Sequence, residues 1–360
     1  MQKNRIKALQ EILKEKQIDA FLITNFYNIV YLTGFKTLTS HERESFVLIT
    51  QKNVYLFSDA RYQNDSIVFV QFKLLTAGNG LIKQLDEIVK EEGIKILGFE
   101  KEDLKWSEYE AIKTSAKIEL FPLDKIIIQL RAIKDKYEID NIKKACKVGD
   151  QSLIELIPYM KFGKSEKEIA FLFEKIVRGK ECELSFDPIV AIDKNSSIPH
   201  YNTKTGKGKI NHSSIILIDC GVNYQGYCSD ITRVFFVNNI SEIMKKKYLS
   251  LKQIHQQTIN QIKEGGKLSE IDLYCRRQMV DCGLPNYPHS TGHGVGLEVH
   301  EYPKVSTFST EQIMRSSVFT IEPGIYFPDE WGMRIEDTVY LDKEGNCNIL
   351  TQFSKEIILL

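Results

Sequence analysis

The sequence predicts two domains, an α/β domain over residues 1–128 and an α+β domain over residues 129–360. A chain of 360 residues is long enough for two or three domains of ordinary size. In its first third, short apolar runs alternate with segments of helical periodicity, which is typical of an α/β domain. Further along, a long amphipathic stripe precedes strand–turn–strand segments, which favours an α+β domain.

The N-terminal domain opens on apolar residues at helical spacing, which predict a helix from Arg5 to about Lys16. Two later stretches, Leu81–Glu92 and Trp106–Lys117, have the same periodicity. Short apolar runs bounded by polar residues alternate with these helices and predict strands. The predicted strands are Ala20–Ile23, Phe46–Ile49, Val54–Phe57 and Ile67–Val70.

The C-terminal domain begins with a change of pattern near Pro122–Lys134. After it, apolar residues from Ile133 to Leu156 follow one face of a helix. Serine–acid spacings typical of helix N-caps and a glycine pair typical of a helix end come next. These signals are Ser165 with Glu168, Ser269 with Asp272, and Gly265-Gly266 after a helix over Leu249–Ile262.

The charge balance excludes several classes of protein. Lys and Arg number 48, as do Asp and Glu, so the net charge is +0. A nucleic-acid binder or a polybasic membrane-surface protein carries a basic excess, so we expect neither kind of partner. No run approaches the roughly 18 apolar residues of a transmembrane helix, and the start lacks a signal-peptide core. The 7 cysteines form no Cys-x-x-Cys pair, which favours a reduced, cytoplasmic location.

Two acidic residues lie on strands that the sequence predicts to pair. The apolar runs Ile215–Gly221 and Tyr227–Phe236 are joined by turn residues. A hairpin centred on Tyr224-Gln225 would place Asp219 directly opposite Asp230. Facing carboxylates repel each other, so a fold that keeps them is expected to neutralise them with a cation.

A second acidic pair has the same arrangement. Phe319–Glu322 and Met333–Glu336 flank a longer connection. A hairpin centred on Asp329 would place Glu322 opposite Glu336. A single acidic pair is more often a solvated strand face, but both pairs stand within apolar runs. Two matching pairs therefore favour a functional site.

Histidines complete the candidate site. His289, His293 and His300 lie close together in a glycine-rich stretch, which favours a site loop or a short strand. His200 is a weaker signal because it stands alone. A lone histidine is more often an ordinary core or surface residue, whereas three at this spacing are not.

This set of donors predicts a metal centre. Four carboxylates and one imidazole form an oxygen-rich, hard set that suits Mn(II) and can also hold Co(II) or Zn(II). Five ligands, two of them able to bridge, suggest two ions about 3.5–4 Å apart that share an activated water. Two such ions supply a nucleophile and an electrophile for amide hydrolysis.

These residues resemble the pita-bread metallopeptidases, which include Xaa-Pro aminopeptidase, Xaa-Pro dipeptidase (prolidase) and methionine aminopeptidase. The resemblance covers nearly the whole chain and implies a creatinase/prolidase-like N-terminal domain before a pita-bread catalytic domain. Because methionine aminopeptidases usually lack the N-terminal domain, the resemblance favours the proline-specific branch. The motifs are Asp219–Gly221 with Gly226–Arg233, then Thr291–Gly296, Thr320–Tyr326 and Arg334–Asp337, while Arg131–Glu138 resembles the opening of the family's catalytic domain.

The resemblance implies a role for each metal ligand. Asp219 would chelate one ion, His293 and Glu322 would hold the other, and Asp230 and Glu336 would bridge both. Glu322 would also be the general base for the metal-bridged water, which is the nucleophile.

The resemblance also implies the residues around the substrate. His300 would hydrogen-bond the scissile carbonyl, and His200 and His289 would line the proline side of the pocket. Arg334 would orient an acidic ligand. An Xaa-Pro bond is a tertiary amide with restricted geometry, so a dedicated pocket is consistent with this chemistry.

Within the proline-specific branch we favour an Xaa-Pro aminopeptidase, which acts on peptides with proline in second place. The alternative is an Xaa-Pro dipeptidase. His41-Glu42-Arg43 resembles a dipeptidase loop whose histidine reaches the neighbouring subunit, and the resemblance implies a homodimer. Lys304 stands where some dipeptidases carry an arginine for the substrate carboxylate, and a solvated surface lysine explains it equally well. Ser316-Ser317 replaces the family's more usual Gly-Met, which we expect to affect a turn.

Two other classes of protein compete with this interpretation. Creatinase resembles the family in fold but works without metal and lacks the full ligand set, whereas all five ligands are present here. Inactive binding proteins of the same fold usually lose ligands and gain basic segments, whereas this chain is neutral. We therefore expect an enzyme, with an inactive binding protein as the remaining alternative.

Overall fold

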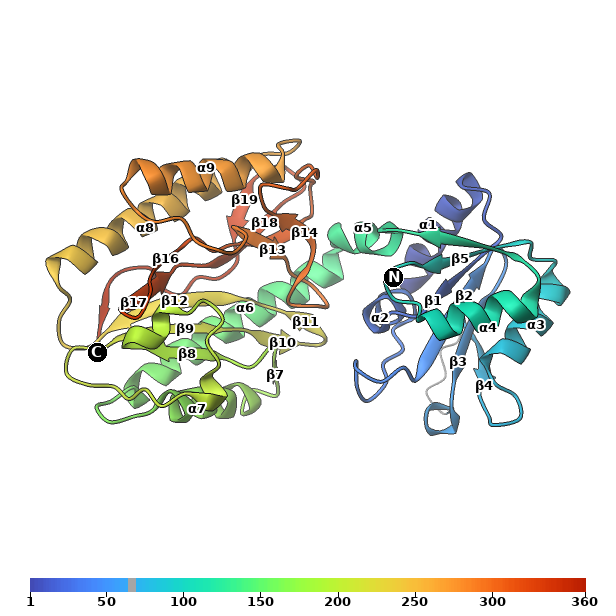
Figure 1. The fold of residues 1–360 in the computed structure, drawn as a ribbon, viewed down its shortest axis with the longest axis horizontal. Helices are drawn as coiled ribbons and strands as arrows, with labels where there is room; N and C mark the ends of the chain where they lie inside the picture. The colour runs from blue at the N-terminus through green and yellow to red at the C-terminus, as the bar shows by residue number, and fades with distance from the viewer. Residues whose placement is uncertain (64–68) are drawn as a thin grey trace. The chain divides into compact units, whose positions relative to one another are not determined.

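The computed structural model describes residues 1–63 and 69–360, which divide into two compact units, Met1–Arg131 and Ala132–Leu360. The first unit is an α/β domain and the second an α+β domain, as the sequence predicts (Figure 1). Within the described residues, no helix is long and apolar enough to span a membrane.

The first unit contains one six-stranded sheet in the order β4-β3-β2-β1-β5-β6. Strands β1, β2 and β3 pair antiparallel, whereas β5 pairs parallel with both β1 and β6. Strand β1 is buried along its whole length, as expected for an unbroken apolar run in the centre of a sheet. The elements are α1 (Gln2–Glu15), β1 (Ala20–Ile23), α2 (Phe26–Thr33), β2 (Ser45–Thr50), β3 (Val54–Ser58), η1 (Ala60–Tyr62), β4 (Gln71–Leu74), α3 (Leu81–Glu92), β5 (Ile96–Glu100), α4 (Trp106–Ala116), β6 (Glu119–Leu123) and α5 (Ile126–Ala132).

One predicted strand of this unit is misplaced. Of Ile67–Val70, the first two residues lie outside the described residues, and Phe69 and Val70 form a turn and a bend. The edge strand β4 begins at Gln71 and pairs parallel with β3.

The second unit surrounds its strands with two pairs of helices. Its sheets have the orders β20-β12-β9-β8, β14-β13-β15-β18-β19, β11-β10-β7 and β16-β17. The first elements are α6 (Lys136–Leu156), η2 (Ile157–Tyr159), α7 (Glu166–Arg178), β7 (Glu183–Leu184), β8 (Ile189–Ile192), η3 (Asp193–Ser197), η4 (Thr203–Thr205), β9 (Ile215–Cys220), β10 (Val222–Tyr224), β11 (Tyr227–Cys228) and β12 (Ile231–Phe236). The remaining elements are α8 (Glu242–Asn260), α9 (Leu268–Asp281), β13 (Gly292–Gly294), β14 (Glu301–Val305), β15 (Val318–Ile321), β16 (Gly324–Phe327), β17 (Trp331–Arg334), β18 (Asp337–Leu341), β19 (Cys347–Ile349) and β20 (Ile358–Leu359).

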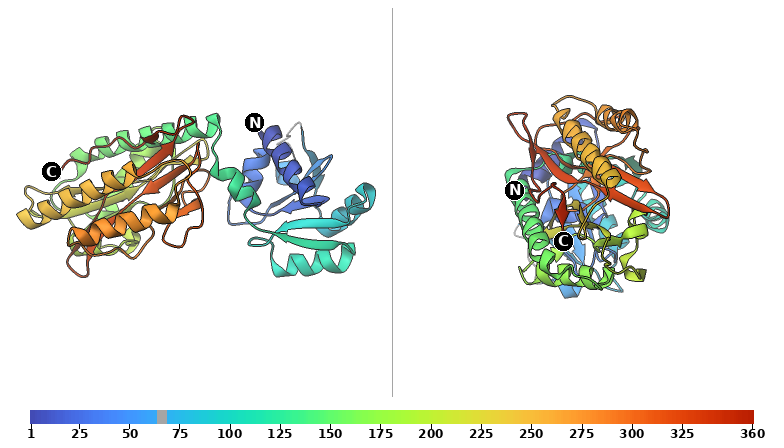
Figure 2. Two further views of the ribbon diagram at one scale, coloured as in Figure 1. Left: turned by 90° about the horizontal axis from the view of Figure 1, so that it is seen from above. Right: turned by 90° about the vertical axis from the view of Figure 1, so that its left-hand side faces the viewer.

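The strands β9 and β12 form the centre of this unit because both of their faces are apolar. On one face, Ile218 and Phe235 pack in a core with residues of α6 and α7. On the other face, Ile215 and Phe236 pack with residues of α8 and α9. Figure 2 shows the two helix pairs on opposite sides of the strands. This layering fixes the strands that carry the acidic residues.

Two helix ends differ in how well the sequence predicts them. Helix α7 has the predicted capping box, in which Ser165 accepts from the Glu168 amide and Glu168 accepts from the Ser165 amide. The cap predicted at Ser269 is wrong, because α9 starts at Leu268. Asp272 is instead buried and accepts hydrogen bonds from Thr291.

Two other features lie in turns. Helix α8 ends at Asn260, several residues before the Gly265-Gly266 pair that the sequence predicts as its end. Gly265 instead takes a left-handed conformation, with φ 77°, in the turn that follows. Ser316 adopts φ 64°, a left-handed conformation that glycine takes more easily. The departure from the family's usual Gly-Met therefore falls on a turn, as predicted.

Candidate metal centre and catalytic cavity

The first acidic pair lies on the hairpin of β9 to β12, but the predicted register is wrong. Asp219 lies opposite Thr232 instead of Asp230. The reason is the turn, since Gln225 (φ 53°) and Gly226 (φ 87°) both adopt left-handed conformations and form a two-residue turn. The centre of the hairpin is thereby displaced from the predicted one. Because side chains alternate with a period of two, Asp219 and Asp230 still share one face.

The second acidic pair, Glu322 and Glu336, lies between two strand ladders that both have the predicted register. Ile321 pairs with Asp337 in the β15–β18 ladder, and Gly324 pairs with Arg334 in the β16–β17 ladder. Glu322 and Glu336 lie between the two ladders, where the strands separate. Glu336 is 2% exposed.

The short strand β13 places His293 beside these acids. A Cβ atom at Gly292 would lie 1.9 Å from the carbonyl oxygen of Thr320, so only glycine allows β13 to approach β15 this closely. His293 Nε2 lies 3.6 Å from both Asp230 Oδ2 and Glu322 Oε1. Its Nδ1 lies 3.1 Å from the Gly294 carbonyl oxygen and donates to it, so the lone pair of Nε2 points toward the acids.

The donor atoms of the five predicted ligands converge. Within each of two groups, the ligand atoms lie within 4.8 Å of one another: Asp219, Asp230 and Glu336 form one, and His293, Glu322 and Glu336 form the other. Glu336 belongs to both groups. Asp230 and His293 also form a third group with His300. The five residues therefore form one continuous site.

The acids of this site are held in an unfavourable electrostatic environment. Burial, followed by repulsion from Asp219, raises the pKa of Glu336 to about 8. Burial and the charge of Glu336 raise the pKa values of Asp230 and Glu322 well above their usual range. Burial lowers the pKa of His293 to about 3, so this ring stays neutral near pH 7 and keeps its lone pair.

Two observations show that the residues fit divalent cations. The Oδ1 atoms of Asp219 and Asp230 are buried and have no hydrogen-bond partner among the described residues. Arg334 provides one positive charge against four acids, donating from Nη2 to Asp219 Oδ2 at 2.6 Å. Carboxylate and imidazole donors match hard divalent ions of the Mn(II) type.

A chain of hydrogen bonds orients the acids from behind. Arg334 Nε donates to Thr232 Oγ1 at 3.0 Å, and Thr232 Oγ1 donates to Glu336 Oε2 at 2.6 Å. Thr232 has no role among the residues predicted from the sequence. The only sequence signal for it is its place between Asp230 and Arg233 in the motif.

The acids open on a cavity of about 790 Å³ whose lining includes the other predicted site residues, His200, His289, His300 and Lys304. His289 is fixed at both ring nitrogens. Its Nδ1 donates to the Ser290 carbonyl at 2.8 Å, and its Nε2 accepts from the Tyr326 hydroxyl at 3.0 Å. Burial, followed by the charge of Arg334, lowers the pKa of His289 to about 3.

His289 is therefore a neutral residue of the cavity wall, whose Nδ1 carries the proton and whose Nε2 accepts a hydrogen bond. The parts that His200, His289 and His300 play at the substrate stay predictions. His200 and His300 are both exposed to the cavity side, and the His300 ring lies with its centroid 4.2 Å from that of His293. Tyr326, inside the Thr320–Tyr326 motif, is a site residue that sequence reasoning missed.

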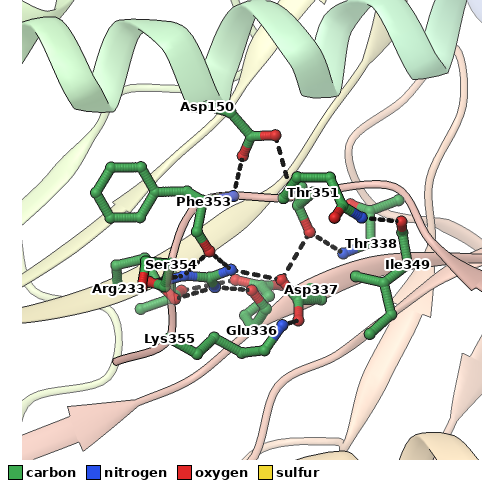
Figure 3. A network of polar contacts seen from close by, with 12 residues as sticks. Asp150, Arg233, Glu336, Asp337, Thr338, Ile349, Thr351, Phe353, Ser354 and Lys355 are labelled. Carbon is green, nitrogen blue, oxygen red and sulfur yellow. Dashed lines mark hydrogen bonds and ion pairs between the residues drawn. The ribbon is translucent and has the colours of Figure 1, made fainter. Parts of the chain in front are cut away.

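Directly behind Glu336, Asp337 belongs to a second polar cluster (Figure 3). Asp337 accepts from Arg233 at 2.6 Å, from Lys355 at 2.5 Å and from Thr351 at 2.8 Å. Arg233 also donates to the carbonyl oxygens of Glu336 and Phe353. Burial alone would raise the pKa of Asp337, but Arg233, His255 and Lys355 together outweigh it and hold that pKa below its usual value.

Four acids gathered against one arginine beside an open cavity are typical of metal-dependent enzymes. Dinuclear sites with these donors catalyse hydrolysis. Comparison with known proteins identifies the family. Residues 140–343 match the model of metallopeptidase family M24, and residues 5–133 match the creatinase/prolidase N-terminal domain. The chain belongs to metallopeptidase family M24 and is a hydrolase, as the resemblance of its motifs implies.

Relatives extend over the full length of the chain. An Xaa-Pro dipeptidase of Pyrococcus horikoshii is 33% identical and covers 98% of this chain and 98% of its own. The structure of an Xaa-Pro dipeptidase from Bacillus anthracis has a TM-score of 0.92 at 32% identity and covers 100% of both chains. The structure of an X-Pro aminopeptidase from Thermotoga maritima has a TM-score of 0.86 at 31% identity, over 96% of this chain and 98% of that one.

Proposed function

We propose that this protein hydrolyses the bond before proline at the N-terminus of peptides, as an Xaa-Pro aminopeptidase. The observation that carries the proposal is the convergence of five metal-ligand side chains on one end of a cavity whose wall includes His200 and His289. The flat rings of this wall suit the apolar, rigid pyrrolidine ring of a proline. Names of relatives that refer to Xaa-Pro peptides support this substrate class.

Five residues would hold two divalent ions, which we propose to be Mn(II), with Co(II) and Zn(II) as alternatives. The ligands are Asp219, Asp230, His293, Glu322 and Glu336. When bound, the ions supply an acidified water and polarise the scissile carbonyl.

The remaining chemistry belongs to the chain's own side chains. The Glu322 carboxylate accepts a proton from the attacking water and returns it to the leaving proline nitrogen. His300 lies at the cavity wall and hydrogen-bonds the substrate carbonyl. Arg334 holds Asp219 in place and, through Thr232, keeps Glu336 oriented.

A specific observation favours the alternative, an Xaa-Pro dipeptidase. Lys304 lines the same cavity, and among the described residues no carboxylate forms an ion pair with its ammonium group. A cation at that place suits the C-terminal carboxylate of a dipeptide, although lysine lacks the bidentate fork of arginine. Dipeptidase names among the relatives are consistent with this alternative.

We also propose a homodimer, on the resemblance of His41-Glu42-Arg43 to the loop that reaches a neighbouring subunit. In the first unit His41 is exposed, whereas Arg43 is held by Asp103 at 2.8 Å. Light scattering tests this proposal. A monomer with full activity would remove any role of His41 in a partner's site.

The test of the function compares Ala-Pro with Ala-Pro-Ala on Mn(II)-loaded protein, with an EDTA-treated sample as the control. Faster cleavage of the tripeptide, lost with EDTA, supports the aminopeptidase. Preference for the dipeptide supports the prolidase and gives Lys304 a role, which Lys304→Ala then tests through KM. Cleavage of neither peptide would contradict the proposal and favour an inactive binding protein.

A further inference from the structure

The segment from Ile192 to Gly208 contributes two residues to the wall of the catalytic cavity. It contains two short 3-10 turns, η3 and η4, with His200 in the irregular stretch between them. Pro199 and His200 line the cavity. Short turns of this kind do not hold a side chain in place by their own hydrogen bonds, so the position of His200 depends on what anchors the segment.

A single buried carboxylate anchors this segment at four points. Glu166, the first residue of α7, is 0% exposed. Its Oε1 accepts from the Ile192 amide and from Asn195 Nδ2, both at 2.8 Å. Its Oε2 accepts from the Tyr201 hydroxyl and the Gly208 amide, both at 2.9 Å. The four donors come from both ends and the middle of the segment, and one of them is next to His200.

The backbone is shaped around this carboxylate. A Cβ atom at Gly206 would lie 2.4 Å from Glu166 Oε2, and one at Gly208 would lie 2.5 Å from Oε1. The two glycines therefore allow the chain to wrap closely around the acid. The Glu166 amide also donates to the Gly208 carbonyl at 3.2 Å, which ties the helix start to the same residue.

The same segment also contacts the strand that carries Arg334. The Ser196 hydroxyl accepts from the Gly332 amide at 2.8 Å and donates to the Asp193 carbonyl at 2.6 Å. The five proposed metal ligands, by contrast, come from segments between Asp219 and Glu336, outside this wall. One long contact links the segment to the residues behind the ligands, since Arg334 Nη1 donates to the Pro199 carbonyl at 3.4 Å. Arg334 keeps its shorter bond of 2.6 Å to Asp219 without this contact, so loosening the segment moves the substrate wall and removes no metal ligand.

We propose that Glu166 is a positioning residue that sets substrate affinity by fixing His200, a role that rests on the proposed peptidase function. A carboxylate only accepts hydrogen bonds, and its two oxygens can serve all four donors. A glutamine of the same shape must turn its NH2 group toward two of those donors. The change Glu166→Gln therefore disrupts the anchor with little change in volume.

The experiment measures Glu166→Gln against a control on the same helix turn, Glu168→Gln. Glu168 is exposed and bonds Lys164 and Ser165, so Glu168→Gln loses the same charge without touching the segment. For Glu166→Gln we expect KM for the better of the two peptides to rise on the order of 10-fold, because misplacing a positioned group by a fraction of an ångström has effects of this size. We expect kcat to change less than KM.

Two further readouts separate positioning from general damage. Mn(II) affinity of the metal-stripped protein, measured by calorimetry, is expected to match that of Glu168→Gln. Trypsin is expected to cleave Glu166→Gln faster than both the parent and the control after Lys204 and Lys207, which are exposed within the segment. Unchanged KM together with unchanged cleavage would overturn the proposal, as would a loss of Mn(II) affinity equal to the loss in KM.

A second variant covers the case in which Glu166→Gln does not fold. Tyr201→Phe removes one donor and keeps the acid, so we expect a smaller rise in KM in the same direction; no rise would then overturn the proposal. If the parent cleaves neither peptide, the proposed function fails, and the trypsin comparison alone decides whether Glu166 anchors the segment.

Discussion

Glu336 and Asp337 are neighbours in the sequence and both are fully buried, yet their environments are opposite. Burial and repulsion from Asp219 raise the pKa of Glu336 to about 8. The pKa of Asp337 lies below its usual value, because Arg233, His255 and Lys355 together outweigh the cost of its burial. Successive side chains of a strand point to opposite faces, so one step along the chain moves an acid from one environment to the other.

The difference shows where this fold compensates negative charge and where it does not. Behind the site, the C-terminal segment is bound by Arg233, and Asp150 of α6 accepts from the amides of Gln352 and Phe353 (Figure 3). Within the site, one arginine stands against four acids. We interpret the cluster around Asp337 as structural, and the excess negative charge of the site as the charge that metal ions neutralise. Substitutions in the cluster should therefore lower stability, whereas substitutions in the site should lower activity.

The largest effect is expected at the uncompensated site. Glu322→Ala should lower kcat/KM by on the order of 10³-fold, because it removes both a ligand and the proposed general base. The fold should remain intact, since one of several repelling acids is removed. Peptide cleavage at saturating Mn(II) and circular dichroism check this; His293→Ala should behave alike, and near-parent turnover in either variant would refute the site assignment.

On the compensated side, the expected loss is in stability. Arg233→Met leaves the buried carbonyl oxygens of Glu336 and Phe353 without this donor and removes the arginine charge from Asp337, which should cost about 3–5 kcal/mol in the free energy of unfolding. Urea unfolding measures it. The control Arg178→Met removes an exposed ion pair with Glu174 and should cost about 0–1 kcal/mol. Equal costs for the two variants would contradict the structural role of the cluster.

The pH dependence of the free energy of unfolding, measured on metal-free protein, is a further difference expected between Glu336 and Asp337. Above about pH 7.5, the histidines with lowered pKa values are almost fully neutral in both the folded and the unfolded state and hardly change stability with pH. Between pH 7.5 and 8.5, Glu336 still binds a proton in part of the folded molecules but not in the unfolded state. The free energy of unfolding should therefore fall as pH rises, by about 0.5–1 kcal/mol over this range.

Urea unfolding of EDTA-treated protein at the two pH values gives this slope directly. The variant Glu336→Gln should flatten it, and added Mn(II) should stabilise the parent more at pH 8.5 than at pH 7.5, because metal competes with the proton. A free energy of unfolding that rises with pH would show that Glu336 is already compensated.

The smallest effect is expected at the edge of the compensated cluster. Lys355→Met removes one of the two cations from Asp337 but leaves Arg233 and Thr351, so we expect a loss of about 1–2 kcal/mol. Lys252→Met serves as the control, because Lys252 pairs with Glu356 near the same segment at the surface. A loss no larger than that of the control would assign the low pKa of Asp337 to Arg233 and His255.

Much of the site could be predicted because its signals are local in the sequence. Each acidic pair lies on one hairpin, so apolar runs and turn residues place both members near each other. The second register follows from its turn, whereas the first is wrong because Gln225 adopts a left-handed conformation that its residue type does not favour. Both acids nevertheless remain on one face, because the register is displaced by an even number of residues and side chains alternate with a period of two.

By itself, the sequence determined two domains, the hairpins with their acids, the glycine-rich histidine strand and the family. Only the tertiary structure decided which neighbouring groups compensate each acid. Asp272 is bonded to Thr291 instead of capping its helix, and Arg233 is bonded to Phe353, a residue far along the chain. Hydrogen bonds between distant segments leave no periodic trace in the sequence, because they depend on how the sheets and helices pack. That packing alone distinguishes Glu336 from Asp337.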